Sequence, residues 1–473
     1  MRGDERRELH KPNTFNSAAI VQTPYKAITM TINRRTFFGA AAGGVALSTI
    51  TTAAAHAAPL DAAQFGVRAN APGDQSAALQ RALEQAAQRR QTLMLAAGQY
   101  RVAGVTVPPG ASLAGARGAT WLILGASGPL LSVRNAPDVS LADLVFDGAG
   151  QRGDALIDVA GARQFRLADC QIARAAGVAL KLTQVEGRVT GNTIGDTGDI
   201  AIHSLDARGL VISGNAILGA GNGGINVWRS EKGADGSIVS DNRIETIAAR
   251  DGGSGQNGNA INVYRAANVI VRGNRIRDAA FSAVRGNAAS GIQIVGNACA
   301  GIGEVALYVE FDFEGAVVSG NTVDDAAIGV AVTNFKQGGR LAVVQGNVLR
   351  NIARRRPAGT DPNDGWGIGI GVEADTAVTG NVIEGAAVAG IAVGAGDYLR
   401  DVTVTGNVVR NAPAGIMVSV TPGAGAAVIS GNRVSGASRG AIVGMAWGKV
   451  ASADLARDAA QFPKVTLSGN SIR

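Results

Sequence analysis

Charged side chains that can carry out acid–base chemistry are concentrated in the middle of the chain. Glu310, Asp312 and Glu314 form a run of three closely spaced carboxylates, with arginines before them and a lysine after them. Paired carboxylates can supply the acid and the base of glycoside hydrolysis. Alternatively, the same three residues can hold Ca²⁺, and an Arg or Lys base then suits β-elimination of a uronate. The candidate catalytic residues are Glu310, Asp312, Arg265, Arg285 and Lys336, and the candidate calcium ligands are Glu310, Asp312 and Glu314.

Side chains suited to sugar recognition lie at corresponding positions of neighbouring repeats. Trp228 and Tyr264 offer rings on which a sugar can stack. Arg229, Arg265 and Arg285 offer guanidinium groups that pair with the carboxylates of uronic acids. These residue types predict a polysaccharide groove on the middle repeats. The candidate substrate-binding residues are Trp228, Arg229, Tyr264, His203, Asn334 and Glu373.

The surroundings of these residues indicate a groove without specifying a reaction. Long insertions at 251–258 and 354–365 precede two of the repeats, and we expect them to form groove walls. The Gly-His-Gly signature of polygalacturonase-type hydrolases is absent from the sequence. Asp361-Pro362-Asn363-Asp364 is similar to the Asp-Pro-His motif of alginate epimerases, but Asn363 replaces the His, so we interpret the segment as a turn.

A recurring Gly-Asn pair shows how these residues are positioned. From residue 191 onward the pair returns with Asn-to-Asn spacings of 23 to 38 residues, and Asp241-Asn242 fills one gap. A minimum spacing of about 23 residues, lengthened by a variable number of inserted residues, is typical of a solenoid whose coils carry loop insertions. Gly and Asn tolerate the positive φ of tight corners, and stacked Asn amides can form a hydrogen-bonded ladder. The predicted ladder comprises Asn192, Asn215, Asn242, Asn274, Asn297, Asn321, Asn347, Asn381, Asn407 and Asn432, with Asn470 in the same register.

Short β-rich runs precede and follow each Gly-Asn pair. Examples are 210–213 before the pair and 225–227 after it, where Val and Ile alternate with other residues. Period-two alternation places the branched side chains inside each coil, and parallel strands bury that inner face. The sequence therefore predicts an all-β fold, a right-handed parallel β-helix of about 23-residue coils.

A helix is expected ahead of the first coils. Asp74 is the predicted N-cap, and Leu79, Leu83 and Ala87 share one face. Such a helix covers the end of the solenoid, whose core would otherwise be exposed. We therefore assign 58–110 to the cap helix and first coil, and 111–473 to the β-helix.

Residues 1–57 have the features of an export signal. Arg34-Arg35 precedes an Ala- and Gly-rich stretch that ends at Ala55-His56-Ala57, a small-x-small cleavage site. The paired arginines followed by Phe resemble the twin-arginine translocation pattern, so the translocation machinery is an expected partner. Met30 offers an alternative start, which makes 1–29 a candidate over-extension. We expect a periplasmic or secreted protein with no stable membrane span.

Charge and cysteine content exclude several classes of protein. The formal charge is +7, but residues 1–57 carry a surplus of four cations, which leaves about +3 for the rest. That charge argues against nucleic-acid binding. Cys170 and Cys299 lie about five coils apart, roughly 24 Å, beyond the reach of a disulfide. His203 is the only His beyond residue 57, which excludes a multi-His metal site.

The N-terminal part of the chain after residue 58 resembles a known superfamily. Phe65-Gly66-Val67, then Asp74-Gln75-Ser76, then Leu95 to Val102 are similar to the first segment of pectate-lyase-like β-helix proteins. Ala-Ala-Gly stands where those proteins have Pro-Ala-Gly. From residue 30 onward, the chain also resembles a family of twin-arginine-translocated uncharacterised repeat proteins. The resemblance implies a right-handed parallel β-helix and export, and it implies no particular activity.

Two functions remain open on the sequence alone. The first is an exported β-helix that binds an acidic polysaccharide in the groove and cleaves or epimerises it, as a lyase, hydrolase or epimerase. The second is a non-catalytic β-helix, a structural or adhesive protein of the cell envelope whose sheets serve only as a scaffold.

Overall fold

The computed structural model describes residues 58–473, apart from 254, 356, 358–359 and 361–364. The predicted export segment, with Arg34 and Arg35, lies outside the described residues, and so does Asp361-Pro362-Asn363-Asp364. In the part of the chain that is described, no helix is long and apolar enough to cross a membrane.

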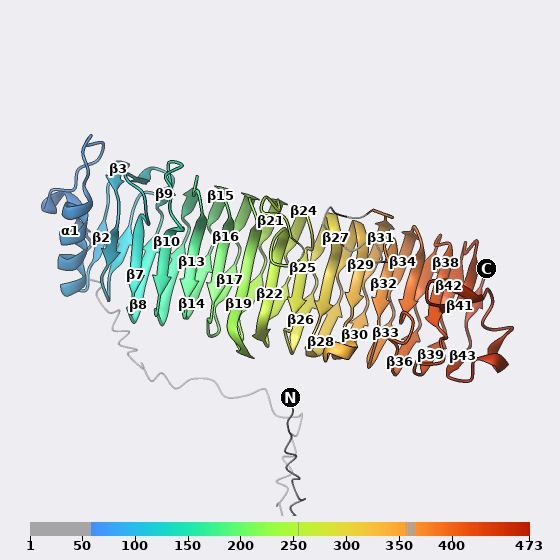
Figure 1. The fold of residues 1–473 in the computed structure, drawn as a ribbon. Helices are drawn as coiled ribbons and strands as arrows, with labels where there is room; N and C mark the ends of the chain where they lie inside the picture. The colour runs from blue at the N-terminus through green and yellow to red at the C-terminus, as the bar shows by residue number, and fades with distance from the viewer. Residues whose placement is uncertain (1–57, 254, 356, 358–359, 361–364) are drawn as a thin grey trace, which may run out of the picture. The chain divides into compact units, whose positions relative to one another are not determined.

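Each coil of the solenoid contributes strands to three faces. In one coil, β14 (Gly187–Thr190) belongs to the first face, β15 (Thr193–Thr197) to the second and β16 (Ile200–Leu205) to the third. Strands of neighbouring coils pair in parallel on all three faces. Figure 1 shows the coils stacked from α1 at one end to the C-terminal strands at the other.

The three faces form two hydrogen-bonded sheets. The first face is a 16-stranded sheet that runs from β1 (Leu60–Asp61) to β43 (Val465–Ser468). The second and third faces form one 28-stranded sheet, because β27 and β29 run through the corner between them. The third-face strands from the fifth coil onward are β16, β19 (Gly223–Ala234), β22 (Asn259–Ala267), β25 (Val284–Asn287), β27 (Ala298–Glu310), β29 (Thr322–Val332), β32 (Ile368–Val372), β35 (Ala389–Val393), β38 (Ala414–Ser419) and β41 (Gly440–Ala446).

The predicted asparagine ladder is confirmed at the corner between the first and second faces. Asn215 Oδ1 accepts from the backbone N–H of Asn192 at 3.0 Å and from its Nδ2 at 2.9 Å, and Asn215 Nδ2 donates to Val189 O at 2.9 Å. The same bonds recur through every predicted Asn to Asn470. The residue before each ladder Asn has φ between 59° and 69°, a region that favours Gly.

The cap helix is present, but its predicted N-cap is wrong by one residue. Helix α1 spans Ser76–Gln88, and its N-cap is Gln75, which makes no side-chain capping bond. Gln75 is buried, and its backbone N–H donates to Arg101 O in the first coil. Asp74 Oδ1 accepts from the backbone N–H of Ser76 at 3.3 Å and from the Ser76 hydroxyl at 2.6 Å. The helix covers the core with Leu79, Ala82, Leu83 and Ala86, while Ala87 is only partly buried.

The two cysteines are free and buried, as predicted. Burial raises the pKa of Cys170 to about 12 and that of Cys299 to about 12, so both remain thiols at neutral pH. Cys170 occupies the ladder position of its coil, where its backbone N–H donates to Asn192 Oδ1 at 2.9 Å. The asparagine ladder therefore begins one coil after Cys170.

Candidate functional site

Outward side chains on the third face form two columns. The register of neighbouring strands places Arg285 opposite Asn262 and Tyr308, and it places Glu310 opposite Asn287. The sequence predicts these residues as a single column, because residue spacing does not give the length of each turn. The Arg285 column contains Lys181, His203, Asn226, Asn262, Arg285 and Tyr308, and the Glu310 column contains Leu205, Trp228, Tyr264, Asn287 and Glu310.

A cleft of about 660 Å³ lies over the two columns at the middle coils. The first insertion contributes Gly255 and Gln256 to it, and Thr360 comes from the second insertion. Asn262 Nδ2 donates to Gly255 O at 2.9 Å, so a hydrogen bond links the first insertion to strand β22 of the third face. Each insertion thus contributes to the lining of the cleft. Its floor and rim carry Trp228, Asn262, Tyr264, Arg285, Asn287, Glu304, Tyr308, Glu310, Phe311 and Asn334.

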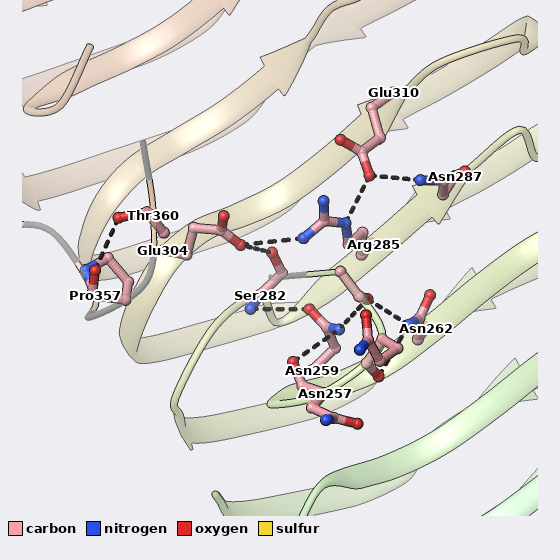
Figure 2. Close-up of polar contacts among 12 residues, drawn as sticks. Asn257, Asn259, Asn262, Ser282, Arg285, Asn287, Glu304, Glu310, Pro357 and Thr360 are labelled. Carbon is pink, nitrogen blue, oxygen red and sulfur yellow. Dashed lines mark hydrogen bonds and ion pairs between the residues drawn. The ribbon is translucent and has the colours of Figure 1, made fainter. Parts of the chain in front are cut away.

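Arg285 forms the centre of the cleft, between two buried carboxylates (Figure 2). Its Nε donates to Glu310 Oε1 at 2.7 Å, and its Nη1 lies 3.4 Å from Glu304 Oε2. Asn287 Nδ2 also donates to Glu310 Oε1, at 2.8 Å, and the Ser282 hydroxyl donates to Glu304 at 3.1 Å. Burial alone lowers the pKa of Arg285, but the carboxylates outweigh burial and raise it. The guanidinium therefore stays charged.

Tyr308 packs against this network. The Arg285 guanidinium lies 4.9 Å from the centre of the Tyr308 ring. Burial, together with the nearby Glu310, raises the pKa of Tyr308, so its hydroxyl remains protonated. Arg285 is thus held by a ring and by both neighbouring carboxylates.

A row of three rings approaches the cleft from the N-terminal side. His203 and Trp228 lie edge to face with ring centres 5.2 Å apart, and Trp228 and Tyr264 lie 5.8 Å apart. Burial and then Lys181 lower the pKa of His203, which keeps its ring neutral at pH 7. Arg265 stacks on the ring of Tyr264 at 4.9 Å and donates to Ser230 O at 2.9 Å.

Several buried polar atoms beside the cleft have no hydrogen-bond partner among the described residues. They are both amide atoms of Asn226, Nε1 of Trp228 and Nδ1 of His203. Asn226 is fully buried and lies in register between His203 and Asn262. Unpaired buried groups cost about 1–3 kcal/mol each, so this cluster departs from ordinary packing.

The predicted calcium ligands do not converge, so that prediction is wrong. Glu310 ends β27 on the third face, whereas Glu314 begins β28 (Glu314–Ser319) on the first face, beyond a corner. Asp312, at that corner, pairs with Lys232 at 2.8 Å, and Glu314 pairs with Arg340. Among the residues that the structure describes, no group of three His, Cys, Asp or Glu side chains could hold a metal ion.

Two further predicted residues belong to a separate cluster. Lys336, in the short helix η2 (Phe335–Gln337), lies with its Nζ 4.1 Å from the centre of the Tyr398 ring. Glu373 Oε2 accepts from the backbone N–H of Phe335 at 3.0 Å, and burial raises the pKa of Glu373. Their neighbour Asn334 does line the cleft. The prediction that Lys336 acts in the same groove as Glu310 is therefore wrong.

Arg229 also lies apart from the cleft. It lines a hollow of about 460 Å³ together with Asp206 and Glu231. Its Nη1 donates to Ala207 O at 3.3 Å, so it points away from Arg285. Of the three arginines predicted to bind uronates, Arg285 alone lines the cleft, and Arg265 lies on a ring at its edge.

Glu304 is the cleft residue that the sequence analysis missed. It lies inside β27, where a register irregularity between Ile302 and Val305 marks the corner of the coil. That corner brings Glu304 to Arg285, six residues before Glu310. The available signal was a single acidic residue within an otherwise apolar run from Ala298 to Val309.

Comparison with known proteins supports the fold. Residues 254–434 match the family model described as a right handed beta helix region. With the parallel three-faced coils, this match confirms the predicted right-handed parallel β-helix. No sequence among the curated proteins matches the chain.

Solved structures with a similar fold have different activities. The catalytic unit of a GH87 alpha-1,3-glucanase from Streptomyces thermodiastaticus is 14% identical, with a TM-score of 0.46, over 88% of this chain and 69% of that chain. PfbA, a surface adhesin of Streptococcus pneumoniae, is 15% identical, with a TM-score of 0.45, over 84% and 94%. The N-terminal fragment of bacteriophage phi29 gene product 12 is 12% identical, with a TM-score of 0.45, over 83% and 73%.

Proposed function

We propose that this protein is an exported β-helix protein that binds a polysaccharide in the third-face cleft. The observation that carries the proposal is the combination of two aromatic rings, Trp228 and Tyr264, with the polar network around Arg285 in one cleft. Apolar faces of sugar rings pack on aromatic side chains, and sugar hydroxyls bond to fixed carboxylates and amides.

The charges around the cleft favour an uncharged sugar over a uronate. The sequence-based expectation of an acidic polysaccharide depended on three arginines that would pair with substrate carboxylates. Arg285 already contacts Glu310 and Glu304, and a uronate carboxylate would approach both of these acids. Hydroxyl groups, in contrast, donate readily to carboxylate oxygens.

Export through the twin-arginine pathway is part of the same proposal, supported by Arg34-Arg35 and the stretch that follows. In it, residues 1–57 act as the signal, and the β-helix acts in the periplasm or outside the cell. Changing Arg34→Lys and Arg35→Lys together should leave the protein in the cytoplasm. Cell fractionation measures this, and unchanged export of the double variant contradicts the proposal.

The binding test uses titration calorimetry with dextran, laminarin and pullulan, and with polygalacturonate and alginate as acidic glycans. We expect a neutral glycan to bind, and Trp228→Ala to weaken binding about tenfold, because a ring contact contributes about 1.4 kcal/mol. Trp447→Ala is the matched control, since Trp447 is exposed near the C-terminal end. If no glycan binds, or if both variants bind equally, the proposal fails and a scaffold role is favoured.

A further inference from the structure

We propose that the cleft hydrolyses the glycan that it binds, with Glu304 and Glu310 as the acid and base pair. This inference rests on the proposed function, because it requires a glycan to lie in the same cleft. Both carboxylates line the cleft, both are buried, and they lie on two sides of one guanidinium (Figure 2). Two carboxylates so placed are the group that glycoside hydrolysis requires.

The separation of the two carboxylates is limited by Arg285. Glu310 Oε1 lies 2.7 Å from Nε, and Glu304 Oε2 lies 3.4 Å from Nη1. Because both nitrogens belong to one planar guanidinium, these oxygens are at most about 8.5 Å apart. Carboxylate pairs of glycoside hydrolases lie roughly 5 to 9.5 Å apart. The two carboxylates are therefore close enough for this reaction, whereas Asp312 and Glu314 pair with other residues outside the cleft.

The hydrogen bonds distinguish the roles of the two acids. Glu310 Oε1 accepts from both Arg285 and Asn287, while its Oε2 receives no hydrogen bond from any described residue. A carboxylate fixed through one oxygen can direct the other at a water molecule or at the sugar, which assigns Glu310 as the base. Glu304 accepts from the Ser282 hydroxyl at 3.1 Å, and its 3.4 Å contact with Arg285 is weaker than the 2.7 Å contact of Glu310, which assigns Glu304 as the acid.

The reaction is a hydrolysis in which water is the only co-reactant. The bond between the anomeric carbon and the bridging oxygen breaks, and Glu304 gives its proton to that oxygen as it leaves. The oxygen of a water molecule bonds to the anomeric carbon, and Glu310 takes the water's proton. No atom is oxidised or reduced, and a proton exchange with solvent returns both acids to their starting forms.

The arrangement of cations argues against the other two reactions expected from the sequence. Elimination and epimerisation both remove a proton beside a uronate carboxylate, which needs a cation to neutralise it and a base nearby. Lys336 lies on Tyr398, and Arg285 is already paired with Glu304 and Glu310. Hydrolysis of a neutral glycan does not require Lys336 or Arg285 to be available to neutralise a substrate carboxylate.

The test measures new reducing ends from dextran, laminarin and pullulan with the full-length protein. We expect Glu304→Gln and Glu310→Gln each to lower kcat by about 100-fold or more, the usual share of general acid–base catalysis. Both variants should still bind glycan. Asp324→Asn is the matched control, because Asp324 is a partly exposed carboxylate outside the cleft, and its kcat should equal that of the unaltered protein.

A second measurement separates chemistry from folding. Azide supplied with Glu310→Ala should restore turnover, because a small anion can replace a missing catalytic carboxylate but cannot replace a structural side chain. Glycan binding without any new reducing ends overturns the hydrolase inference and leaves the proposed function standing. Absence of glycan binding overturns the proposed function itself. Full turnover in Glu304→Gln or Glu310→Gln also overturns the inference.

Discussion

Buried asparagines in two regions of the same solenoid differ in how they are paired. In the ladder, Asn297 Oδ1 accepts two hydrogen bonds from Asn274, and its Nδ2 donates to Val271 O and to the next Asn. On the third face, Asn226 is equally buried, but neither of its amide atoms has a partner among the described residues. The first arrangement repeats in each coil from Asn192 to Asn470, whereas the second occurs only at Asn226 among the described asparagines.

This difference separates stabilising positions from functional ones. A polar group that repeats with the coil satisfies its neighbours, and such a ladder contributes to stability along the whole axis. A buried polar group that appears once and has no partner instead costs stability, and Asn226 lies in register beside the cleft residue Asn262. Four substitutions test this division, beginning with the ladder itself.

Asn297→Ala should produce the largest loss of stability. Asn274 would lose the acceptor for its backbone N–H and for its side-chain amide, and Val271 O would lose its donor. With about 1–3 kcal/mol for each unpaired buried group, we expect a loss of about 4 kcal/mol. Denaturant unfolding followed by circular dichroism measures it.

The end of the ladder provides the control for that experiment. Asn470 is only partly buried, and its Oδ1 accepts from the backbone N–H and the side-chain amide of Asn432. Water can satisfy the groups that Asn470→Ala leaves, so we expect a loss of about 1 kcal/mol. Equal losses at the two positions contradict the view that the buried ladder stabilises the coils.

Arg285→Met should give the second-largest loss. It leaves Glu310 buried without the cation that contacts it at 2.7 Å, and breaking a buried ion pair costs about 3–5 kcal/mol. Adding Glu310→Gln to this variant should recover most of the stability, because the carboxylate that lost its cation is then removed. If Arg285→Met and the unaltered protein unfold at the same denaturant concentration, the view that the buried ion pair stabilises the fold is contradicted.

Asn226→Ala should change the stability in the opposite direction to Asn297→Ala. Removing an amide whose atoms are unpaired removes a desolvation penalty, so we expect stability to rise by about 1 kcal/mol. The same substitution should leave glycan binding, measured by titration, largely unchanged, because Asn226 is fully buried and does not line the cleft. A loss of stability comparable to that of Asn297→Ala shows that Asn226 is a structural residue.

Repetition explains how much of the structure the sequence could predict. The ladder residues recur in one register, so the coil, the corner geometry and the free Cys170 and Cys299 followed from spacing alone. The cleft has no such repetition. Trp228, Tyr264 and Arg285 were identified by residue type, but their division into two columns depends on turn lengths that differ from coil to coil.

Corners account for the other errors. Three residues separate Glu310 from Glu314 in the sequence, yet the chain turns from the third face to the first between them. Conversely, the irregularity at 302–305 brings Glu304 to the same guanidinium as Glu310. A strand pattern of period two cannot show where a β-helix turns, so residues beside a corner are the ones that sequence reasoning misplaces.

Cys170→Asn should have the smallest effect, a gain of about 1 kcal/mol from one added ladder step. Cys170 already donates its backbone N–H to Asn192 Oδ1, and its sulfur lies 3.8 Å from Leu141 O. Leu141 is in register with Leu167, whose carbonyl accepts from Asn192, so a new amide at 170 meets the same partners one coil earlier.

The other buried cysteine tests whether position or residue type produces that gain. Cys299 faces the core two residues after a ladder Asn, between Ile276 and Val323 on adjacent strands. An amide there has no ladder partner, so Cys299→Asn should lower stability by about 1–3 kcal/mol. Because both substitutions replace a buried thiol with the same amide, opposite signs in denaturant unfolding establish that the ladder register decides the outcome. Changes of the same sign contradict that conclusion.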